Sequence, residues 1–242
     1  MGCAGLLGAS VITSVSALAP RFLYDFLTPG WMVVQVGSEA AGRDVTETLL
    51  IVGVAAAVVF VAVLLVEGAL RSGYDPAYHS GSELSLGDRG WIQMANFLQM
   101  GVGMFAFALG VHQALNAVIG PVLLAIFGLG SIASGVFVPD PMRGYPPGGP
   151  TGTPAELTRH HQVHTAAGPV MFLAIFGACL TLAGRLLGAW RLYTVLTAVV
   201  GLALTIWTAL AYQRDAANSG LVQRALILVY WSWIVLLGLH LL

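Results

Sequence analysis

Long apolar stretches alternate with short polar segments along most of the chain. A membrane-crossing helix needs about twenty predominantly apolar residues to cover a hydrocarbon core of roughly 30 Å. Because lipid offers no hydrogen-bond partners, each stretch has to satisfy its own backbone groups, which favours helices. The pattern therefore predicts an all-α, polytopic membrane bundle of six transmembrane helices, at residues 49–70, 91–112, 118–138, 161–184, 192–212 and 221–242.

Residues 1–48 precede these stretches and carry a weaker signal. The first twenty are uncharged and moderately apolar, and they lack the positive start of a secretory signal. Residues 22–27, followed by Trp31, fit an amphipathic segment in the membrane interface. We predict an interfacial or partner-binding segment at 1–48 and a six-helix domain at 49–242. A seventh, marginal span within 1–48 is the alternative.

Composition supports a membrane protein and excludes other classes. Hydrophobic residues make up 57% of the chain and charged residues only 9%, whereas an ordinary soluble domain is about a quarter charged. The ten cationic residues are all arginine, and the formal net charge is −1. This excludes a basic nucleic-acid-binding face and an extended disordered chain. The two cysteines, Cys3 and Cys179, have no metal-binding or scaffold spacing.

Six spans place alternate loops on the same side of the membrane. Residues 71–90, 139–160 and 213–220 then share one side, which we call the loop end, and they hold most of the acids and histidines. The opposite side, the turn end, has a very short loop with Arg185 and Arg191 and no acid between them. Since acids contribute little to the positive-inside rule, we expect the turn end to be cytoplasmic.

A histidine-containing segment at the loop end is a candidate metal site. Glu156, His160 and His164 are spaced by four, so on a helix they share a face. Two imidazoles one turn apart with a nearby carboxylate suit zinc or another divalent metal. Asp140, from the preceding loop, is a further candidate ligand. The alternative is that the histidines cap the helix start and bond to loop backbone.

Polar residues at the loop ends of several helices suggest a pocket. Gln93 and Asn96 continue the helical spacing of Arg89, and amides in a membrane helix are expected to face the bundle interior. We predict a cavity that is polar at its mouth, or alternatively amides that only bond to neighbouring helices. The expected polar lining is Glu83, Arg89, Gln93, Asn96, Asp215 and Arg224. The expected deeper aromatic lining is Trp207, Tyr230, Trp231 and Trp233.

Three further features of the sequence could have a structural or functional role. Glu67 and Arg71 are four residues apart and can pair on one helix face. Residues 138–154 are dense in Pro and Gly, which predicts an ordered lid or, alternatively, a passive spacer. His112 and His240 fall at matched depth near the turn end and could ligate a haem iron, although snorkelling to the interface explains them equally well.

From Tyr74 to the C-terminus the chain resembles a bacterial family of uncharacterised six-span proteins, domain-of-unknown-function family 998, which is distantly similar to the Frag/DRAM/Sfk membrane group. The matching segments are 74–76, 82–85 before 90–91, 137–141, 144–147, the spacing from His160 to His164, and 220–224. The family usually has Gly after the first histidine, where this chain has His161. The resemblance implies a fold and a bacterial cytoplasmic membrane location, but no reaction.

Three functions follow as hypotheses. The first is a non-enzymatic protein whose cavity binds a lipid or small amphiphile. The second is an accessory subunit of a larger respiratory or photosynthetic complex, contacting its partner through residues 1–48. The third is a metal-dependent hydrolase with ligands at His160 and His164 and a general base at Glu83 or Asp215. The expected partners are membrane lipids and other membrane subunits, with no nucleic acid.

Overall fold

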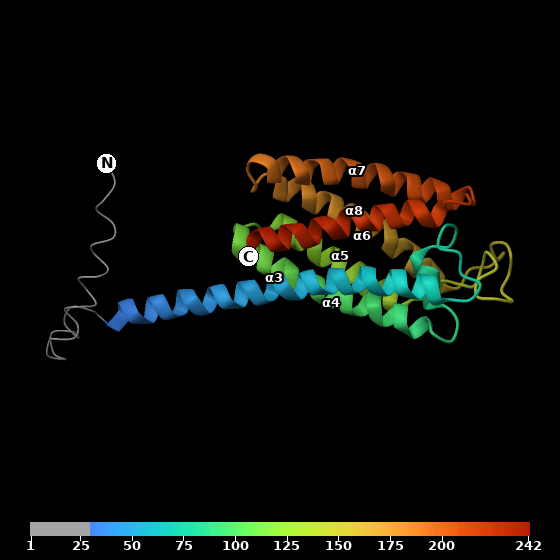
Figure 1. The fold of residues 1–242 in the computed structure, drawn as a ribbon, viewed down its shortest axis with the longest axis horizontal. Coiled ribbons are helices and arrows are strands. Elements are labelled where there is room, and N and C mark those ends of the chain that lie inside the picture. The colour runs from blue at the N-terminus through green and yellow to red at the C-terminus, as the bar shows by residue number, and fades with distance from the viewer. Residues whose placement is uncertain (1–29) are drawn as a thin grey trace. The chain divides into compact units, whose positions relative to one another are not determined.

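The computed structural model describes the backbone from residue 30 onwards and side chains from residue 42. The chain divides into two compact units, 1–45 and 46–242. In the described part every regular element is helical, and six helices are long and apolar enough to cross a membrane, as predicted (Figure 1). These helices are α3 (Gly30–Leu70), α4 (Gly90–Leu115), α5 (Ile119–Val136), α6 (Arg159–Ala183), α7 (Gly188–Gln213) and α8 (Ser219–Leu241).

The first spanning helix begins earlier than the hydrophobic pattern predicts. Helix α3 runs from Gly30 to Leu70, whereas the predicted span begins at residue 49. Polar and charged residues between Ser38 and Thr48 interrupt the apolar pattern, so the sequence gives no continuous hydrophobic signal before residue 49. The predicted interfacial segment at 22–27 and any seventh span within 1–29 lie outside the described residues.

Glycines set the close approach of neighbouring helices. A methyl group added at Gly103 of α4 would lie 2.3 Å from the Cβ of Ala56 on α3. One added at Gly101 would lie 2.7 Å from the carbonyl oxygen of Gly128 on α5. Small residues of this kind let backbones touch in a bilayer, where apolar side chains gain nothing by leaving the lipid. The spacing of these glycines therefore fixes how α3, α4 and α5 pack.

Helix α8 carries much of the aromatic core. Its Trp231 ring packs against Phe60 of α3 and Phe127 of α5, with ring centroids 4.9 and 5.3 Å away. The indole nitrogen of Trp233 donates to the hydroxyl of Thr194 on α7 at 3.1 Å. Trp207 differs, because 54% of it is exposed on the outer face of α7. The prediction that Trp207 lines an interior cavity is therefore wrong.

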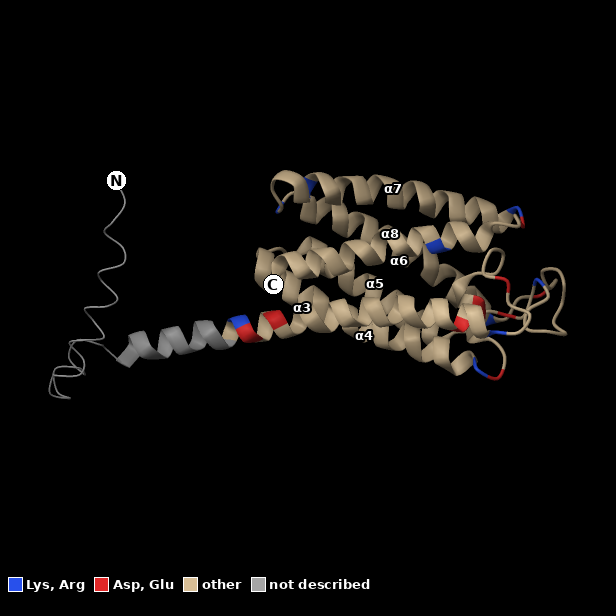
Figure 2. Cartoon of the chain, viewed as in Figure 1, with Lys and Arg blue, Asp and Glu red and all other residues tan. Residues whose placement is uncertain are grey.

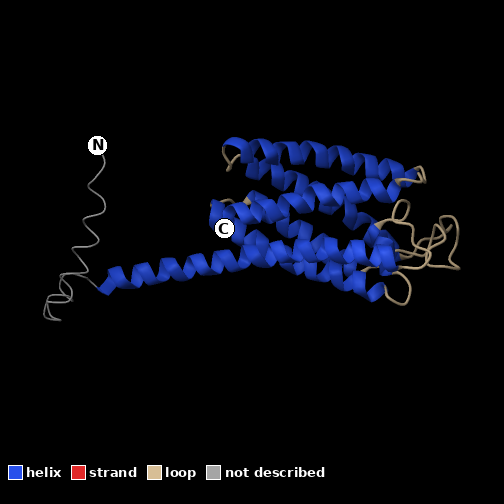
Figure 3. Cartoon of the chain, viewed as in Figure 1, coloured by secondary structure: helices blue, strands red, loops and turns tan. Residues whose placement is uncertain are grey.

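The long connections gather at one end of the bundle. Figure 3 shows the segments between α3 and α4 and between α5 and α6 as loops on the same side. The first of these contains a short 3-10 helix, η1 (Gly81–Ser85). The turn between α7 and α8 lies at this end too, so the loop end holds most of the polar side chains that can form a site.

Candidate functional site at the loop end

Arg71 ties the two long loops to the end of α3. Its Nε donates to the carboxylate of Glu67 at 2.8 Å, which confirms the predicted pair. Its terminal nitrogens donate to the carbonyl oxygens of Leu84 and Leu86 and to the hydroxyl of Tyr145, at 2.9 to 3.1 Å. Because its donors are spent on backbone and protein oxygens, Arg71 is a structural cation and is not available to a ligand.

Arg224 ties the loop between α3 and α4 to the start of α8. It donates to the carbonyl oxygens of His79 and Gly220, both at 3.0 Å, and to the hydroxyl of Tyr74 at 2.6 Å. Burial raises the pKa of Tyr74 to about 12, although the Arg224 cation opposes the rise. The phenol therefore stays protonated and passes a hydrogen bond on to the carbonyl oxygen of Ser80 at 2.9 Å.

Glu83 is the one buried acid of helix η1. It is 2% exposed, and its Oε2 accepts from the backbone N–H of Ser80 at 2.9 Å in a capping box. Its Oε1 has no hydrogen-bond partner among the described residues. Burial raises the pKa of Glu83 to about 7, against the lowering effect of Arg143 and Arg224. This carboxyl therefore changes charge near neutral pH.

The segment 139–158 is held in place across the loop end. The backbone N–H of Asp75 donates to His79 Nδ1 at 2.8 Å, so the proton of that ring is on Nε2. The Nε2–H then donates to the carbonyl oxygen of Arg143 at 3.1 Å. Tyr145 is buried, with its ring 5.3 Å from that of Tyr74. These contacts favour the ordered interpretation of this segment over a passive spacer.

Arg143 stands at the centre of a charged and aromatic cluster. Its guanidinium lies 3.9 Å from the centroid of the Tyr212 ring and donates to the Tyr212 carbonyl oxygen at 2.6 Å and to Ser219 Oγ at 3.2 Å. Its Nε is 3.3 Å from the carboxylate of Asp215, which also accepts from the Tyr78 hydroxyl at 2.6 Å. The cation is thus oriented by three elements of the fold.

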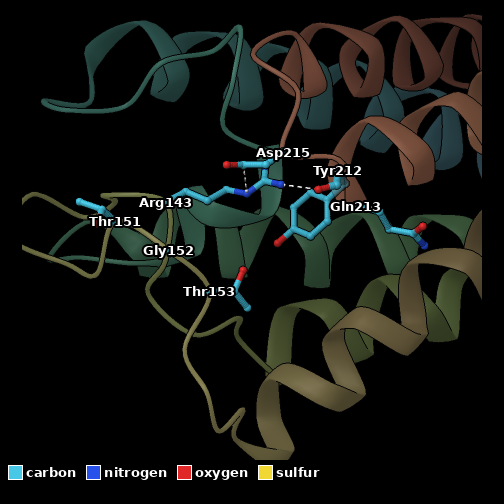
Figure 4. A pocket seen from close by; sticks show the side chains of 7 residues that line it. All are labelled: Arg143, Thr151, Gly152, Thr153, Tyr212, Gln213 and Asp215. Atoms are coloured by element: carbon cyan, nitrogen blue, oxygen red, sulfur yellow. Dashed lines mark hydrogen bonds and ion pairs between the residues drawn. The ribbon is translucent and has the colours of Figure 1, made fainter.

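This cluster borders a pocket of about 250 Å³ at the surface of the loop end (Figure 4). The ion pair and the Tyr212 ring form one side, and the 151–153 backbone forms the other. The lining residues are Arg143, Thr151, Gly152, Thr153, Tyr212, Gln213 and Asp215.

Both members of the ion pair have a left-handed backbone. The φ angle is 58° at Arg143 and 52° at Asp215. Such conformations cost on the order of 1–2 kcal/mol for most residues other than glycine, and Asp tolerates them better than Arg. The surrounding hydrogen bonds hold both residues there, and strain of this kind is concentrated at binding sites.

Most of the predicted pocket residues are packed rather than open. Gln93 and Asn96 are buried, and Asn96 Nδ2 donates to the carbonyl oxygen of Phe60 on α3 at 3.0 Å. These contacts support the alternative prediction, in which the amides bond to a neighbouring helix and do not line a cavity. Arg89 has 48% of its side chain exposed and pairs with Glu67. Of the six predicted residues, Asp215 lines the pocket described above, while Glu83 and Arg224 lie in the buried network.

The candidate metal ligand Asp140 is engaged with protein groups. Its carboxylate accepts from the backbone N–H and the hydroxyl of Thr158, at 2.8 and 2.7 Å. Burial alone raises the pKa of Asp140, but the hydrogen bonds from Thr158 bring it below its usual range. The backbone N–H of Asp140 donates to His161 Nδ1 at 3.0 Å. His161, rather than His160, is therefore the imidazole that meets this loop.

The other three candidate ligands point different ways. His164 is buried, and its Nδ1–H donates to the carbonyl oxygen of Phe137 at 2.7 Å. His160 is exposed against the Phe137 ring, and Glu156 is exposed as well. Within residues 42–242, no group of three or more His, Cys, Asp or Glu side chains is arranged to hold a metal ion. Metal binding at this set remains a prediction without geometric support.

The two histidines considered for haem have partners of their own. His112 Nδ1 donates to the carbonyl oxygen of Ala117 at 2.6 Å and so caps the end of α4. The His240 ring stacks on Trp190 with a centroid separation of 4.1 Å. These contacts explain both side chains without an iron.

Sequence reasoning missed the central residue of the pocket. Arg143 lies within a Pro- and Gly-rich run and has no helical or strand periodicity around it. Tyr212 ended a predicted span at the loop end and Gln213 began the next connection, so only their position placed them near the predicted pocket. The only local hint was a single arginine inside a segment otherwise without charge between Asp140 and Glu156.

Comparison with known proteins gives one match. The family model described as "protein of unknown function (DUF998)" matches residues 54–240, which is most of the chain. No curated protein and no solved structure matches the chain.

Proposed function

The chain belongs to the DUF998 family and is a multi-pass membrane protein, and we propose that it binds the polar headgroup of a lipid or small amphiphile in the pocket beside Arg143 and Asp215. The observation that carries this proposal is the oriented ion pair on the wall of the pocket. Its groups are held by Tyr212, Ser219 and Tyr78, so they present a fixed pattern of charge to a ligand.

The lining chemistry fits a small polar headgroup. Hydroxyls at Thr151 and Thr153 and the amide of Gln213 can each donate and accept hydrogen bonds. The positive and negative charges of the ion pair balance, which favours a neutral or zwitterionic group over a multiply charged anion. A few placed polar groups at one pocket wall are typical of binding sites.

The outer face of α7 offers a path for an apolar tail. Trp207 and Leu210 are three residues apart, as are Leu210 and Gln213, so each pair is adjacent on the helix surface and the three residues form a stripe that winds toward the pocket. Trp207 and Leu210 are exposed, and Gln213 lines the pocket. A ligand with its headgroup at Gln213 can therefore lay its chain along the helix within the bilayer.

Native mass spectrometry of the protein in mild detergent tests the proposal. We expect the wild type to retain a lipid or amphiphile after gentle extraction. Gly152→Trp should abolish that retention, because the space around Gly152 is open and an indole there fills the pocket. The matched control is Ala155→Trp, an exposed position in the same loop that does not line the pocket.

Two outcomes would refute headgroup binding. One is a wild-type protein that carries no lipid or amphiphile at any detergent level that preserves its fold. The other is equal retention by Gly152→Trp and wild type, with unchanged thermal stability.

A further inference from the structure

The turn between α6 and α7, at the opposite end from the pocket, carries two exposed arginines. Arg191 reaches back over the turn, where its Nε donates to the carbonyl oxygens of Ala183 and Leu186 at 3.2 and 2.9 Å. This places its guanidinium beside the backbone that flanks Arg185. Among residues 42–242, Arg185 has neither an ion pair nor a side-chain hydrogen bond, and Arg191 has no ion pair. Within residues 42–242 the turn thus has two positive charges without a counter-ion.

Exposed apolar side chains flank these charges. Leu187, at the tip of the turn, is 77% exposed, and Leu192 is exposed one turn into α7. Trp190 lies between them, stacked on His240 of α8. Tryptophan and arginine near a helix end are the residues that anchor a protein at the membrane interface. The turn therefore combines cationic, aromatic and aliphatic groups at one membrane level.

The loop end presents its exposed arginines beside acids. Arg159 and Arg214 are exposed there, and Glu156 and Asp215 lie within three residues of them in the chain. Three of its arginines, Arg71, Arg143 and Arg224, are buried and bonded within the protein. Arg89 is partly exposed but pairs with Glu67. Figure 2 shows blue and red mixed at the loop end and blue alone at the start of α7.

We propose that the turn at residues 184–192 is a binding site for an anionic phospholipid of the adjacent leaflet, with the lipid phosphate between Arg185 and Arg191 and an acyl chain against Leu187 and Leu192. Charge complementarity carries the choice of occupant, because two unpaired cations face a surface that is negative in cytoplasmic leaflets. Arginine matches a phosphate through paired N–H groups, and the apolar flanks hold this site at lipid depth. The site is independent of the headgroup pocket at the loop end.

Native mass spectrometry with defined lipids tests this site. The full-length protein is titrated with dioleoyl-phosphatidylglycerol or with zwitterionic dioleoyl-phosphatidylcholine at equal concentration. We expect tighter retention of phosphatidylglycerol, and a drop of about fivefold in Arg185→Gln, from roughly 1 kcal/mol for one arginine near a charged surface. Arg185→Lys should keep most of the preference. Since Arg185 has no side-chain partner in the described protein, neither change should affect folding.

Arg214→Gln is the matched control, because Arg214 is exposed at the opposite end of α7. It should bind phosphatidylglycerol as the wild type does. Equal retention of the two lipids by the wild type would overturn the proposal. So would an equal loss in Arg185→Gln and Arg214→Gln, or displacement of the bound lipid by millimolar glycerol phosphate, which would show that the turn binds soluble phosphates.

Discussion

The guanidinium of Arg224 donates to the hydroxyl of Tyr74 at 2.6 Å, and this bond joins residues 150 positions apart in the chain. It links the second turn of α8 to the loop that leaves α3. Both side chains are buried at the membrane boundary, where water is not there to replace a lost partner. Hydrogen bonds from buried arginines therefore connect the loop end across distant segments, alongside its buried apolar side chains.

Arg224→Met should destabilise the protein by about 3 kcal/mol, because it removes the buried cation that donates to the Tyr74 hydroxyl and to two carbonyl oxygens. Tyr74→Phe should cost about 1–2 kcal/mol, since Arg224 keeps its backbone acceptors. The double variant should lose less than the sum of the two, by about 1 kcal/mol. Unfolding in detergent micelles measures all three. Arg214→Met, at an exposed position, is the control and should leave stability unchanged; strict additivity of the pair would contradict the coupling.

Glu83 should give the protein a distinctive pH dependence. Its folded pKa of about 7 lies above the ordinary value of 4.5, so the folded state binds the proton more tightly than the unfolded state. Protonation of Glu83 therefore contributes fully to the free energy of unfolding below pH 4.5. This contribution, on the order of 3 kcal/mol in total, is lost as the pH rises to 7. Glu83→Gln removes this loss because the amide stays neutral.

The measurement for Glu83 is the stability difference between Glu83→Gln and wild type from pH 4.5 to 8. The free energy of unfolding of Glu83→Gln should increase relative to that of the wild type as the pH rises to 7, and the difference should then stay constant. A difference independent of pH would mean that Glu83 titrates alike in the folded and unfolded states.

Gly201 should not tolerate a side chain. A methyl group there would lie 2.2 Å from the Tyr230 ring of α8, so Gly201→Ala forces α7 and α8 apart. We expect a cost of about 1–3 kcal/mol in thermal or chemical unfolding. Gly168→Ala on α6 is the control, because nothing lies within 4 Å of that position and alanine favours a helix. Combining Gly201→Ala with Tyr230→Leu should cost less than the two changes added, since the smaller side chain makes room.

Tyr145 should decide whether the segment 139–158 stays closed over the loop end. Tyr145→Ala removes the hydroxyl that accepts from Arg71 and the ring that packs on Tyr74. Hydrogen exchange of the Gly144 amide, which bonds the Pro150 carbonyl oxygen at 2.7 Å, should then accelerate by at least about tenfold. Thr151→Ala, an exposed change in the same segment, should leave that rate alone. Unchanged exchange in Tyr145→Ala would assign the anchoring to other contacts.

The sequence predicted the membrane spans to within a few residues, except at the start of α3. It predicted the Glu67–Arg71 pair because helical spacing alone brings these residues together. It did not identify the Arg143–Asp215 pair, because residues 72 positions apart in two irregular segments have no shared period. For the same reason His160 and His164, correctly placed on one helix, differ in burial once α5 and the loop pack against them.

The sequence by itself determined that this protein is an all-helical membrane bundle and which connections share a side. Both follow from local physics, since about twenty apolar residues must form a helix in lipid and successive spans must alternate in direction. The tertiary structure alone decided which arginines are buried as structural cations and which remain free at the turn between α6 and α7. That division depends on which carbonyls and carboxylates meet each guanidinium across distant segments, and no local pattern encodes it.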